Sequence, residues 1–311
     1  MRKTSWRVAQ GVAGALILFF LVKDFLANWK QVQEQPIQWE MHWEFIVASL
    51  IITWAMYGVL IWGWRAVLIG WREWLRIVDA ARIWTISSLG KYIPGKVWSI
   101  AGMAIMSQER GVSGTAATGS AVIMQLISIA TGAMIALALT GTAVLDRLVG
   151  GFGSLAAMVL AGVALVCAMA LTAPSLTRRI GFVLGRPDAV RPVDPSALAA
   201  SLFANLVAWA GYGISLQLLA LGTLHGASLS WPTATGAFAA SYVIGYLVLF
   251  LPAGLGVREG VMILLLKDSI GIGPAAAIAA ASRITLTVNE IGAALPFLLF
   301  RSKPRELIRP A

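Results

Sequence analysis

The chain has 311 residues, of which 59% are hydrophobic and only 12% are charged, and its mean hydropathy is +0.80. A soluble domain carries about 25% charged residues, so this composition excludes an ordinary soluble fold and indicates a protein embedded in lipid. The formal net charge of +10 falls in short loops between apolar stretches. There it indicates membrane topology and attraction to anionic headgroups rather than a nucleic-acid partner. The single cysteine, Cys167, lies in an apolar run, which excludes an intrachain disulfide.

The N-terminal segment begins with basic residues and continues into an apolar stretch from Val8 to Val22, as a secretory signal would. No small-residue cleavage site follows this stretch, because the chain continues into Lys23, Asp24 and Phe25. We therefore interpret it as an uncleaved first transmembrane helix.

Hydropathy predicts six full membrane spans, each close to the roughly 20 residues that cross about 30 Å of hydrocarbon. They lie near residues 8–26, 45–69, 114–142, 153–174, 196–222 and 274–301. The expected fold is an all-α polytopic membrane protein.

Two further regions, 74–110 and 232–268, each hold two shorter apolar stretches separated by proline and glycine. A helix break inside a bilayer leaves backbone groups unpaired, and it survives only where protein buries it or a wet cavity adjoins it. We interpret both regions as re-entrant hairpins whose tips lie inside the membrane. The alternative is two ordinary spans joined by a tight turn at the far surface. The breaks lie at Pro94 and Gly95 in the first region and at Pro252, Gly254 and Gly256 in the second.

Most lysine and arginine residues fall on the side of the N-terminus when the chain is threaded through these spans. The positive-inside rule then predicts a multi-pass protein of the cytoplasmic (inner) membrane, with both termini in the cytoplasm. The whole chain, 1–311, reads as a single transmembrane domain made of two repeats, about 8–142 and about 153–301. Both repeats have the order span, span, broken hairpin, span. They enter the membrane from opposite sides, as the inverted repeats of many transporters do.

Six charged residues are expected inside the membrane, where each charge costs roughly 2.5 kcal/mol or more and therefore faces a partner or a cavity. Four are positive and two are negative: Lys91, Lys96, Arg258, Arg283, Glu259 and Glu290. The surplus of two positive charges suits an anionic group such as a phosphate, while the glutamates would balance charge or accept protons. Helix N-termini just after Gly95 and Gly256 would add N–H donors to the same place.

A simpler interpretation makes these charges internal ion pairs that lock the second hairpin to the last span. The pairs would be Arg258 with Glu259 and Arg283 with Glu290. Arg283 and Glu290 lie seven residues apart, or two helical turns, so they share one face of the helix. Such pairing leaves the two lysines unexplained, unless the first hairpin is shallow and places them at the cytoplasmic headgroup level.

The sequence shows no constellation typical of catalysis or metal binding. Its only histidines, His42 and His225, fall on the exterior side without metal-ligand spacing to another histidine, cysteine or carboxylate. Neither a nucleophile elbow nor a phosphate-binding glycine loop occurs in a suitable context. We expect no cofactor, no metal and no enzymatic activity.

Two stretches around the breaks resemble the signature motifs of the lysylphosphatidylglycerol synthase transmembrane, or flippase-like, family. They are LGKYIPGKVW at 89–98 and PAGLGVRE at 252–259, the second with Ala253 where a glycine is commoner in that family. The resemblance covers roughly 8–301 and implies a lipid-translocating domain, with Tyr92 of the first motif among the headgroup-binding residues. It also implies a standalone member, because the sequence stops ten residues past its last predicted span, without the soluble aminoacyl-transferase domain.

Together these patterns predict a protein that flips an anionic or phosphate-bearing lipid across the cytoplasmic membrane. Aminoacyl-phospholipids, glycolipids and polyprenyl-phosphate-linked sugars are all candidates. A small-anion secondary transporter, or an accessory subunit or enzyme of lipid-linked sugar metabolism, is the alternative. A homo-oligomer or a biosynthetic enzyme partner is left open. The expected headgroup-binding residues are Lys91, Tyr92, Lys96, Arg258 and Arg283.

Overall fold

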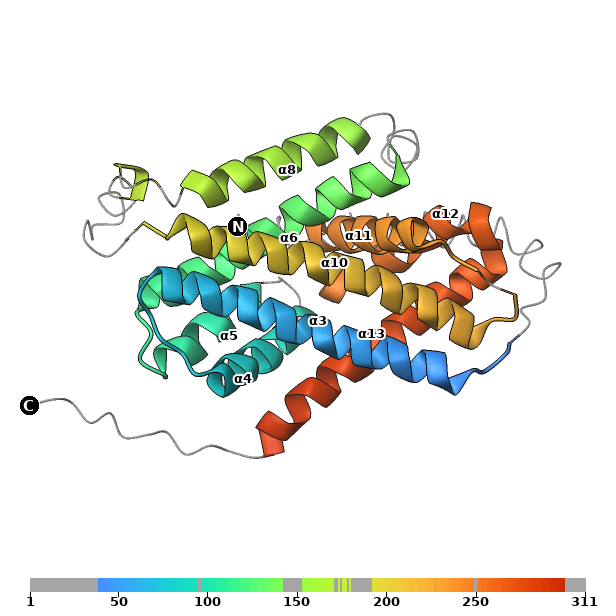
Figure 1. Ribbon diagram of the computed structural model, residues 1–311, viewed down its shortest axis with the longest axis horizontal. Helices are drawn as coiled ribbons and strands as arrows, with labels where there is room; N and C mark the ends of the chain where they lie inside the picture. The colour runs from blue at the N-terminus through green and yellow to red at the C-terminus, as the bar shows by residue number, and fades with distance from the viewer. Residues whose placement is uncertain are drawn as a thin grey trace, which may run out of the picture.

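A computed structural model describes residues 39–93, 97–141, 153–170, 173, 175–177, 179, 192–226, 228–248 and 251–299. These residues form helices and contain no β-strand, and Trp39 and Leu224 make an isolated antiparallel bridge. The all-α class is therefore confirmed for this part of the chain (Figure 1). The first predicted span, 8–26, lies outside the described residues.

The helices follow the predicted elements, with ends that differ by a few residues. In the first half they are α3 (Trp43–Gly70), α4 (Ile77–Ser88), the 3₁₀ turn η1 (Leu89–Tyr92), α5 (Val97–Gln108) and α6 (Gly114–Thr140). In the second half they are α8 (Gly153–Ala170), α10 (Pro195–Thr223), α11 (Trp231–Leu247), the 3₁₀ turn η2 (Pro252–Gly254), α12 (Val257–Ile270) and α13 (Ile272–Leu299). The inverted relation between the two halves stays a prediction.

Three of the described helices, α3, α6 and α10, are long and apolar enough to cross a membrane. They have 28, 27 and 29 residues, so at 1.5 Å per residue each is about 40 Å long and exceeds the hydrocarbon thickness of about 30 Å. The chain is therefore a multi-pass membrane protein. The helix α8 holds a shorter apolar segment, Ala157–Val166, and α13 carries Arg283 and Glu290. The count of six full spans stays a prediction.

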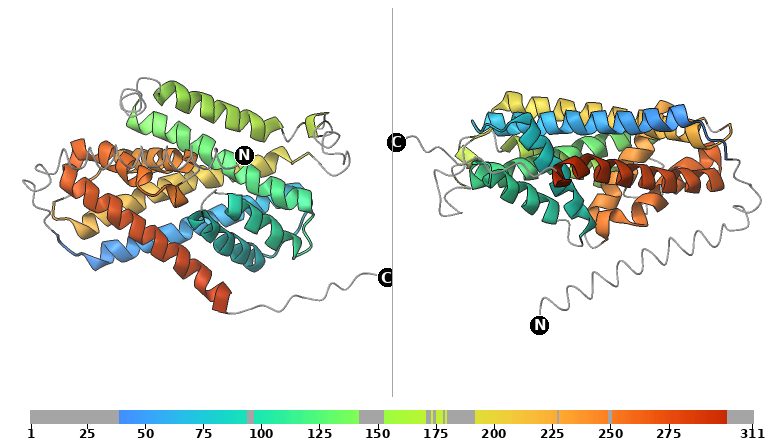
Figure 2. Two further views of the ribbon diagram at one scale, coloured as in Figure 1. Left: turned by 180° about the vertical axis from the view of Figure 1, so that it is seen from behind. Right: turned by 90° about the horizontal axis from the view of Figure 1, so that it is seen from below.

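The helices α3 and α10 run side by side (Figures 1 and 2). Small residues permit this close approach, since a Cβ on Gly63 would lie only 2.6 Å from the Cβ of Ala204. Buried hydroxyls add a hydrogen-bond cluster across the same interface: the Ser215 Oγ lies 2.8 Å from the Ser49 Oγ and 2.9 Å from the Thr53 Oγ1. Because lipid offers helices no hydrophobic reason to associate, small residues and interhelical hydrogen bonds such as these hold a membrane bundle together.

The two hairpins meet at their broken ends. The turn η1, which follows α4, packs against η2, which lies between α11 and α12. At η2 the backbone reverses through left-handed conformations, with φ of 49° at Ala253, 68° at Gly254 and 82° at Gly256. A Cβ on Gly254 would lie 2.7 Å from the carbonyl oxygen of Gly245 on α11, so glycine is required for this close turn.

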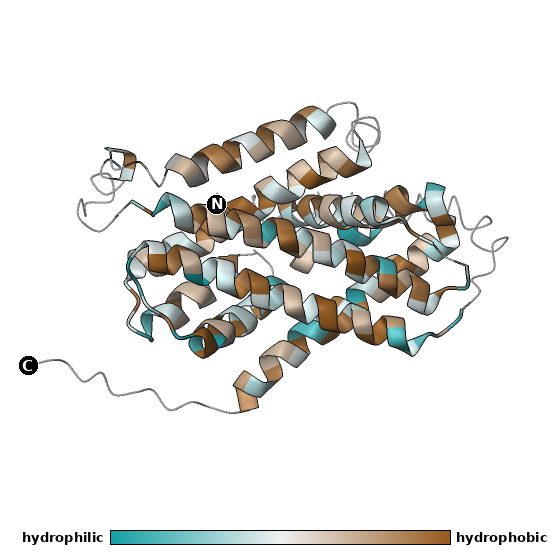
Figure 3. Cartoon of the chain, viewed as in Figure 1, coloured by the Kyte–Doolittle hydropathy of each residue, from teal (hydrophilic) through white to brown (hydrophobic). Residues whose placement is uncertain are grey.

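The last helix, α13, crosses both hairpins and contacts α12 on one side and α4 on the other (Figure 2). Its long apolar side chains at 284, 288 and 291 are more than half exposed, as expected for a surface in contact with lipid. Hydropathy mapped on the chain shows mostly apolar helix bodies, with many of the hydrophilic residues near helix ends (Figure 3). Arg283, Thr287 and Glu290 of α13 instead contact the hairpins, where they help to build the site described next.

Candidate functional site

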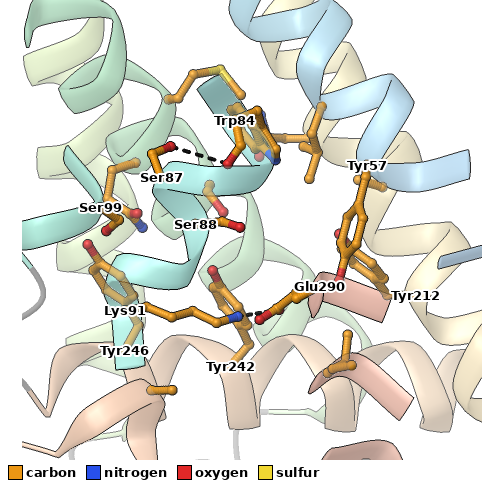
Figure 4. A pocket seen from close by; sticks show the side chains of 18 of the residues that line it. Tyr57, Trp84, Ser87, Ser88, Lys91, Ser99, Tyr212, Tyr242, Tyr246 and Glu290 are labelled. Atoms are coloured by element: carbon orange, nitrogen blue, oxygen red, sulfur yellow. Dashed lines mark hydrogen bonds and ion pairs between the residues drawn. The ribbon is translucent and has the colours of Figure 1, made fainter. Parts of the chain in front are cut away.

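A cavity of about 200 Å³ lies where the two hairpins meet the rest of the bundle. Its walls come from α3, α4, α5, α6, α10, α11, α12 and α13, together with the two 3₁₀ turns. Figure 4 shows side chains from separate elements, including Tyr57, Ser88, Tyr242 and Glu290, arranged around this space. The cavity is smaller than the roughly 300–1,000 Å³ pockets that enclose a whole small-molecule ligand, so it suits a headgroup rather than a complete lipid.

One wall of the cavity carries an ion pair between the first hairpin and the last helix. The ammonium of Lys91 on η1 binds the Oε1 of Glu290 on α13, and the glutamate side chain is only 7% exposed (Figure 4). The neighbouring Tyr92 donates its hydroxyl to the Oε2 of Glu290 at 2.9 Å and lies 3.2 Å from the Oγ1 of Thr287. Both oxygens of the Glu290 carboxylate are thus engaged by the first motif.

The second hairpin is joined to α13 in a corresponding way. Arg283 donates from Nη1 to the carbonyl oxygen of Ala253 at 3.0 Å and lies 3.5 Å from the Oε1 of Glu259. The Oε2 of Glu259 accepts a hydrogen bond of 2.7 Å from the backbone N–H of Gly256. This carboxylate therefore caps the N-terminus of α12. The predicted N–H donors just after Gly256 are a separate set, and the cap occupies only the N–H of Gly256 itself.

Arg258 is buried in the first turn of α12 and lines the same cavity. A Cβ on Gly245 of α11 would lie 3.0 Å from the Arg258 Cβ, so the absence of a side chain at 245 lets the arginine sit deep in the bundle. The guanidinium carbon lies 4.9 Å from the centre of the Phe238 ring, a cation–π distance. Within the described part of the chain, Arg258 forms no ion pair and its Nη2 has no hydrogen-bond partner.

An unpaired buried charge is costly, because desolvation of an ion is repaid only by a close counter-ion and full hydrogen bonding. The ring of Phe238 compensates only part of that cost. Arg258 is therefore the cavity residue best placed to bind an anion.

The ion pairs suggested as the simpler alternative, Arg258 with Glu259 and Arg283 with Glu290, are wrong. Adjacent residues on a helix point in different directions, which separates Arg258 from Glu259. Seven helical residues span about 10 Å along the axis, too far for Arg283 and Glu290 to bond directly. The structure pairs Arg283 with Glu259 and leaves Glu290 to Lys91.

Of the predicted headgroup-binding residues, the structure places Lys91, Arg258 and Arg283 on the cavity wall, while Tyr92 contacts Glu290 behind it. Lys96, Pro94 and Gly95 lie outside the described residues. The described members of the predicted set carry three positive charges against those of Glu259 and Glu290, which leaves a surplus of one. Trp98, the last residue of the first motif, is about half exposed.

Sequence reasoning missed much of the polar and aromatic lining. Tyr57 on α3 and Gln125 on α6 each have a buried side-chain atom without a hydrogen-bond partner among the described residues. On the opposite side, Trp209 and Tyr242 pack edge to face with ring centres 5.3 Å apart, beside Tyr212. The available signals were the i, i+4 spacing of Tyr242 and Tyr246 just before the second break and the aromatic residues of α10 and α11. The lining residues missed include Tyr57, Trp84, Gln125, Asn205, Trp209, Tyr212, Tyr242 and Tyr246.

The two histidines lie away from the cavity, next to the point where the segment before α3 meets the end of α10. His225 and His42 both bind Glu40, the latter at 3.0 Å, and the Glu40 N–H donates to the carbonyl oxygen of Thr223. The hydrogen bond from His225 is the main cause that lowers the pKa of the Glu40 carboxyl below its ordinary value. No group of three potential metal ligands occurs within the described residues.

Comparison with known protein families gives a match that covers most of the chain. Residues 7–288 match the family described as "Lysylphosphatidylglycerol synthase TM region". A search of curated proteins finds no match. The matched range includes both motifs, most of the cavity lining and the greater part of α13, and it ends before Glu290.

Proposed function

Because the chain belongs to the lysylphosphatidylglycerol synthase transmembrane family, we propose that it moves a phosphate-bearing lipid headgroup across the cytoplasmic membrane. Family membership supports a role connected with membrane lipids. The observation that carries the proposal further is the partly open cavity at the meeting point of two broken hairpins, with the buried, unpaired Arg258 in its wall. The cavity suits transport rather than catalysis, because every charged residue in its described lining except Arg258 is held in an ion pair.

In this proposal both hairpins are re-entrant, and they belong to two inverted repeats within six full spans. The contact between η1 and η2 supports this arrangement, because two turns at opposite water-exposed surfaces would lie too far apart to touch. The N- and C-termini lie in the cytoplasm. Irregular backbone at 251–256 is tolerated inside the membrane because it is packed against protein and borders the cavity.

The headgroup binds in the cavity while the acyl or prenyl chains stay in the surrounding lipid. Arg258 supplies the charge that compensates the phosphate, and the N–H and O–H groups around it replace water during passage. The ion pairs Lys91–Glu290 and Arg283–Glu259 hold each hairpin against α13. Exchange of these pairs during the transport cycle would open the cavity first to one leaflet and then to the other.

The proposal is tested with purified protein in proteoliposomes that contain a phospholipid with a fluorescent acyl chain. Dithionite quenches fluorophores in the outer leaflet, so the rate at which protected lipid becomes quenchable reports translocation. Wild-type protein should accelerate this rate, and Arg258→Gln should reduce the protein-dependent rate at least tenfold. Lys267→Gln is the matched control, because it removes an exposed positive charge from the same helix, α12.

Full activity of correctly inserted Arg258→Gln protein would overturn the assignment of this arginine. No acceleration by the wild-type protein, together with uptake of a water-soluble anion into the same vesicles, would favour a small-anion transporter instead. That rival uses the same buried positive charge but requires no lipid.

A further inference from the structure

The cavity wall contains three buried polar atoms without hydrogen-bond partners in the described part of the chain. They are the Oη of Tyr57, the Nε2 of Gln125 and the Nη2 of Arg258, from α3, α6 and α12. The two nitrogens are donors only, and the tyrosine hydroxyl is also able to donate. Buried polar groups are normally satisfied, so three orphan donors around one space indicate a missing ligand that is rich in acceptors.

The charge of that ligand follows from the ion pairs already formed. Lys91 is neutralised by Glu290 and Arg283 by Glu259, which leaves Arg258 alone among the described cavity cations. One uncompensated arginine matches one negative charge. A phosphodiester carries a single charge shared by two free oxygens, whereas a phosphomonoester approaches two charges at neutral pH.

Among the described residues that line the cavity, no carboxylate is free to bind an added ammonium group. Both oxygens of Glu290 are bound, by Lys91 and Tyr92. Glu259 is not among the cavity-lining residues: its Oε2 accepts from the Gly256 N–H, and its Oε1, which has no hydrogen-bond partner among the described residues, forms the ion pair with Arg283 at 3.5 Å. Once the phosphate has paired with Arg258, an additional ammonium in this space would have no counter-ion, which is unfavourable in a low-dielectric interior.

Uncharged polar groups line another part of the wall. The hydroxyls of Ser87 and Ser88 donate to backbone carbonyls within α4, to Trp84 at 3.2 Å and Thr85 at 2.8 Å. Their remaining lone pairs are available as acceptors. A headgroup with hydroxyls, such as a glycerol or a sugar, would donate to these oxygens without bringing in charge.

From these observations, and resting on the proposed function, we infer that the transported headgroup is a singly charged phosphodiester with a neutral, hydroxylated substituent. The cavity discriminates against headgroups that add an ammonium group, such as aminoacyl esters, and against phosphomonoesters. It also discriminates against neutral glycolipids, which lack the anion that Arg258 requires. The specificity thus resides in the single unpaired charge at Arg258 and in the donors at Tyr57 and Gln125.

The inference is tested by translocation of four lipids with identical fluorescent acyl chains in proteoliposomes of one composition. They are phosphatidylglycerol, lysyl-phosphatidylglycerol, phosphatidic acid and monoglucosyl diacylglycerol. Phosphatidylglycerol should move at least tenfold faster than each of the others. Equal rates for phosphatidylglycerol and lysyl-phosphatidylglycerol, or a preference for any of the other three, would overturn the inference while leaving lipid translocation intact. Failure of all four lipids to move would instead overturn the proposed function and the inference with it.

A second variant keeps the test independent of the loss of Arg258. Gln125→Glu places a carboxylate on the cavity wall and removes one orphan donor, so the local surplus of positive charge disappears. The ratio of phosphatidylglycerol to lysyl-phosphatidylglycerol transport should fall at least tenfold in this variant. Native mass spectrometry of bound lipids gives an independent readout of the same ratio. An unchanged ratio in both assays, with normally inserted protein, would contradict the charge-matching basis of the selectivity.

Discussion

The ion pair between Lys91 and Glu290 gives a prediction whose magnitude follows from its burial. Glu290→Gln leaves the Lys91 ammonium without its counter-ion, while the glutamine oxygen still accepts from Tyr92. Removing one partner of a buried pair costs about 3–5 kcal/mol. The lysine side chain is 30% exposed, so solvent screening places the cost at the lower end, about 3 kcal/mol. For a chain of this size that corresponds to a fall in Tm of about 6 °C.

The assay is thermal unfolding of purified protein followed by tryptophan fluorescence, applied to a double-mutant cycle. Lys91→Met alone should also destabilise, because it leaves the buried carboxylate with only the Tyr92 donor. The double variant, Lys91→Met with Glu290→Gln, should unfold well above the temperature expected from adding the two single effects. Asp268→Asn is the control, since it neutralises an exposed carboxylate on α12. Additivity of the two single effects within about 0.5 kcal/mol would refute a direct pair in the folded state.

Two other predictions concern helix packing and the exterior cluster. Gly213→Ala should sharply reduce the yield of folded protein, because its Cβ would overlap the side chain of Thr235. Gly162→Ala is the control: open space surrounds this position, so the substitution should be neutral or stabilising by up to about 1 kcal/mol. Equal yields of the two variants in size-exclusion chromatography would contradict the close α10–α11 contact. The lowered pKa of Glu40 means that its ionised form stabilises the fold above its ordinary pKa of 4.5, and this contribution is lost as pH falls through the folded-state value. Wild-type Tm should therefore drop more than that of Glu40→Gln when pH is lowered from 6 to below about 4, and parallel pH profiles would show that the bond to His225 contributes nothing.

The helices themselves follow closely from the sequence, because hydropathy and proline–glycine breaks are local signals. The predicted spans 45–69, 114–142 and 196–222 correspond to α3, α6 and α10. The break at 252–256 separates α11 from α12 as its composition predicts. These features depend on a few adjacent residues, and they need no knowledge of the tertiary contacts.

The partners of the buried charges did not follow from the sequence in the same way. Spacing placed Arg283 and Glu290 on one helical face, but their bonding is decided by the hairpins that pack against that face. Glu290 meets Lys91, which is 199 residues away along the chain, and no local pattern predicts such a contact. Tyr57 and Gln125 were not predicted as site residues for a related reason. An uncharged residue in an apolar span resembles its neighbours until the fold shows what surrounds it.

The most direct test of a headgroup site between the hairpins is cryo-electron microscopy of the protein in nanodiscs that contain phosphatidylglycerol. Binding as proposed predicts density for a phosphate within hydrogen-bonding distance of the Arg258 guanidinium, with its acyl chains leaving toward lipid. A lipid-free cavity, with phosphatidylglycerol bound only on the outer faces of the bundle, would contradict it. So would hairpin tips that lie at the water-exposed surfaces instead of meeting inside the membrane.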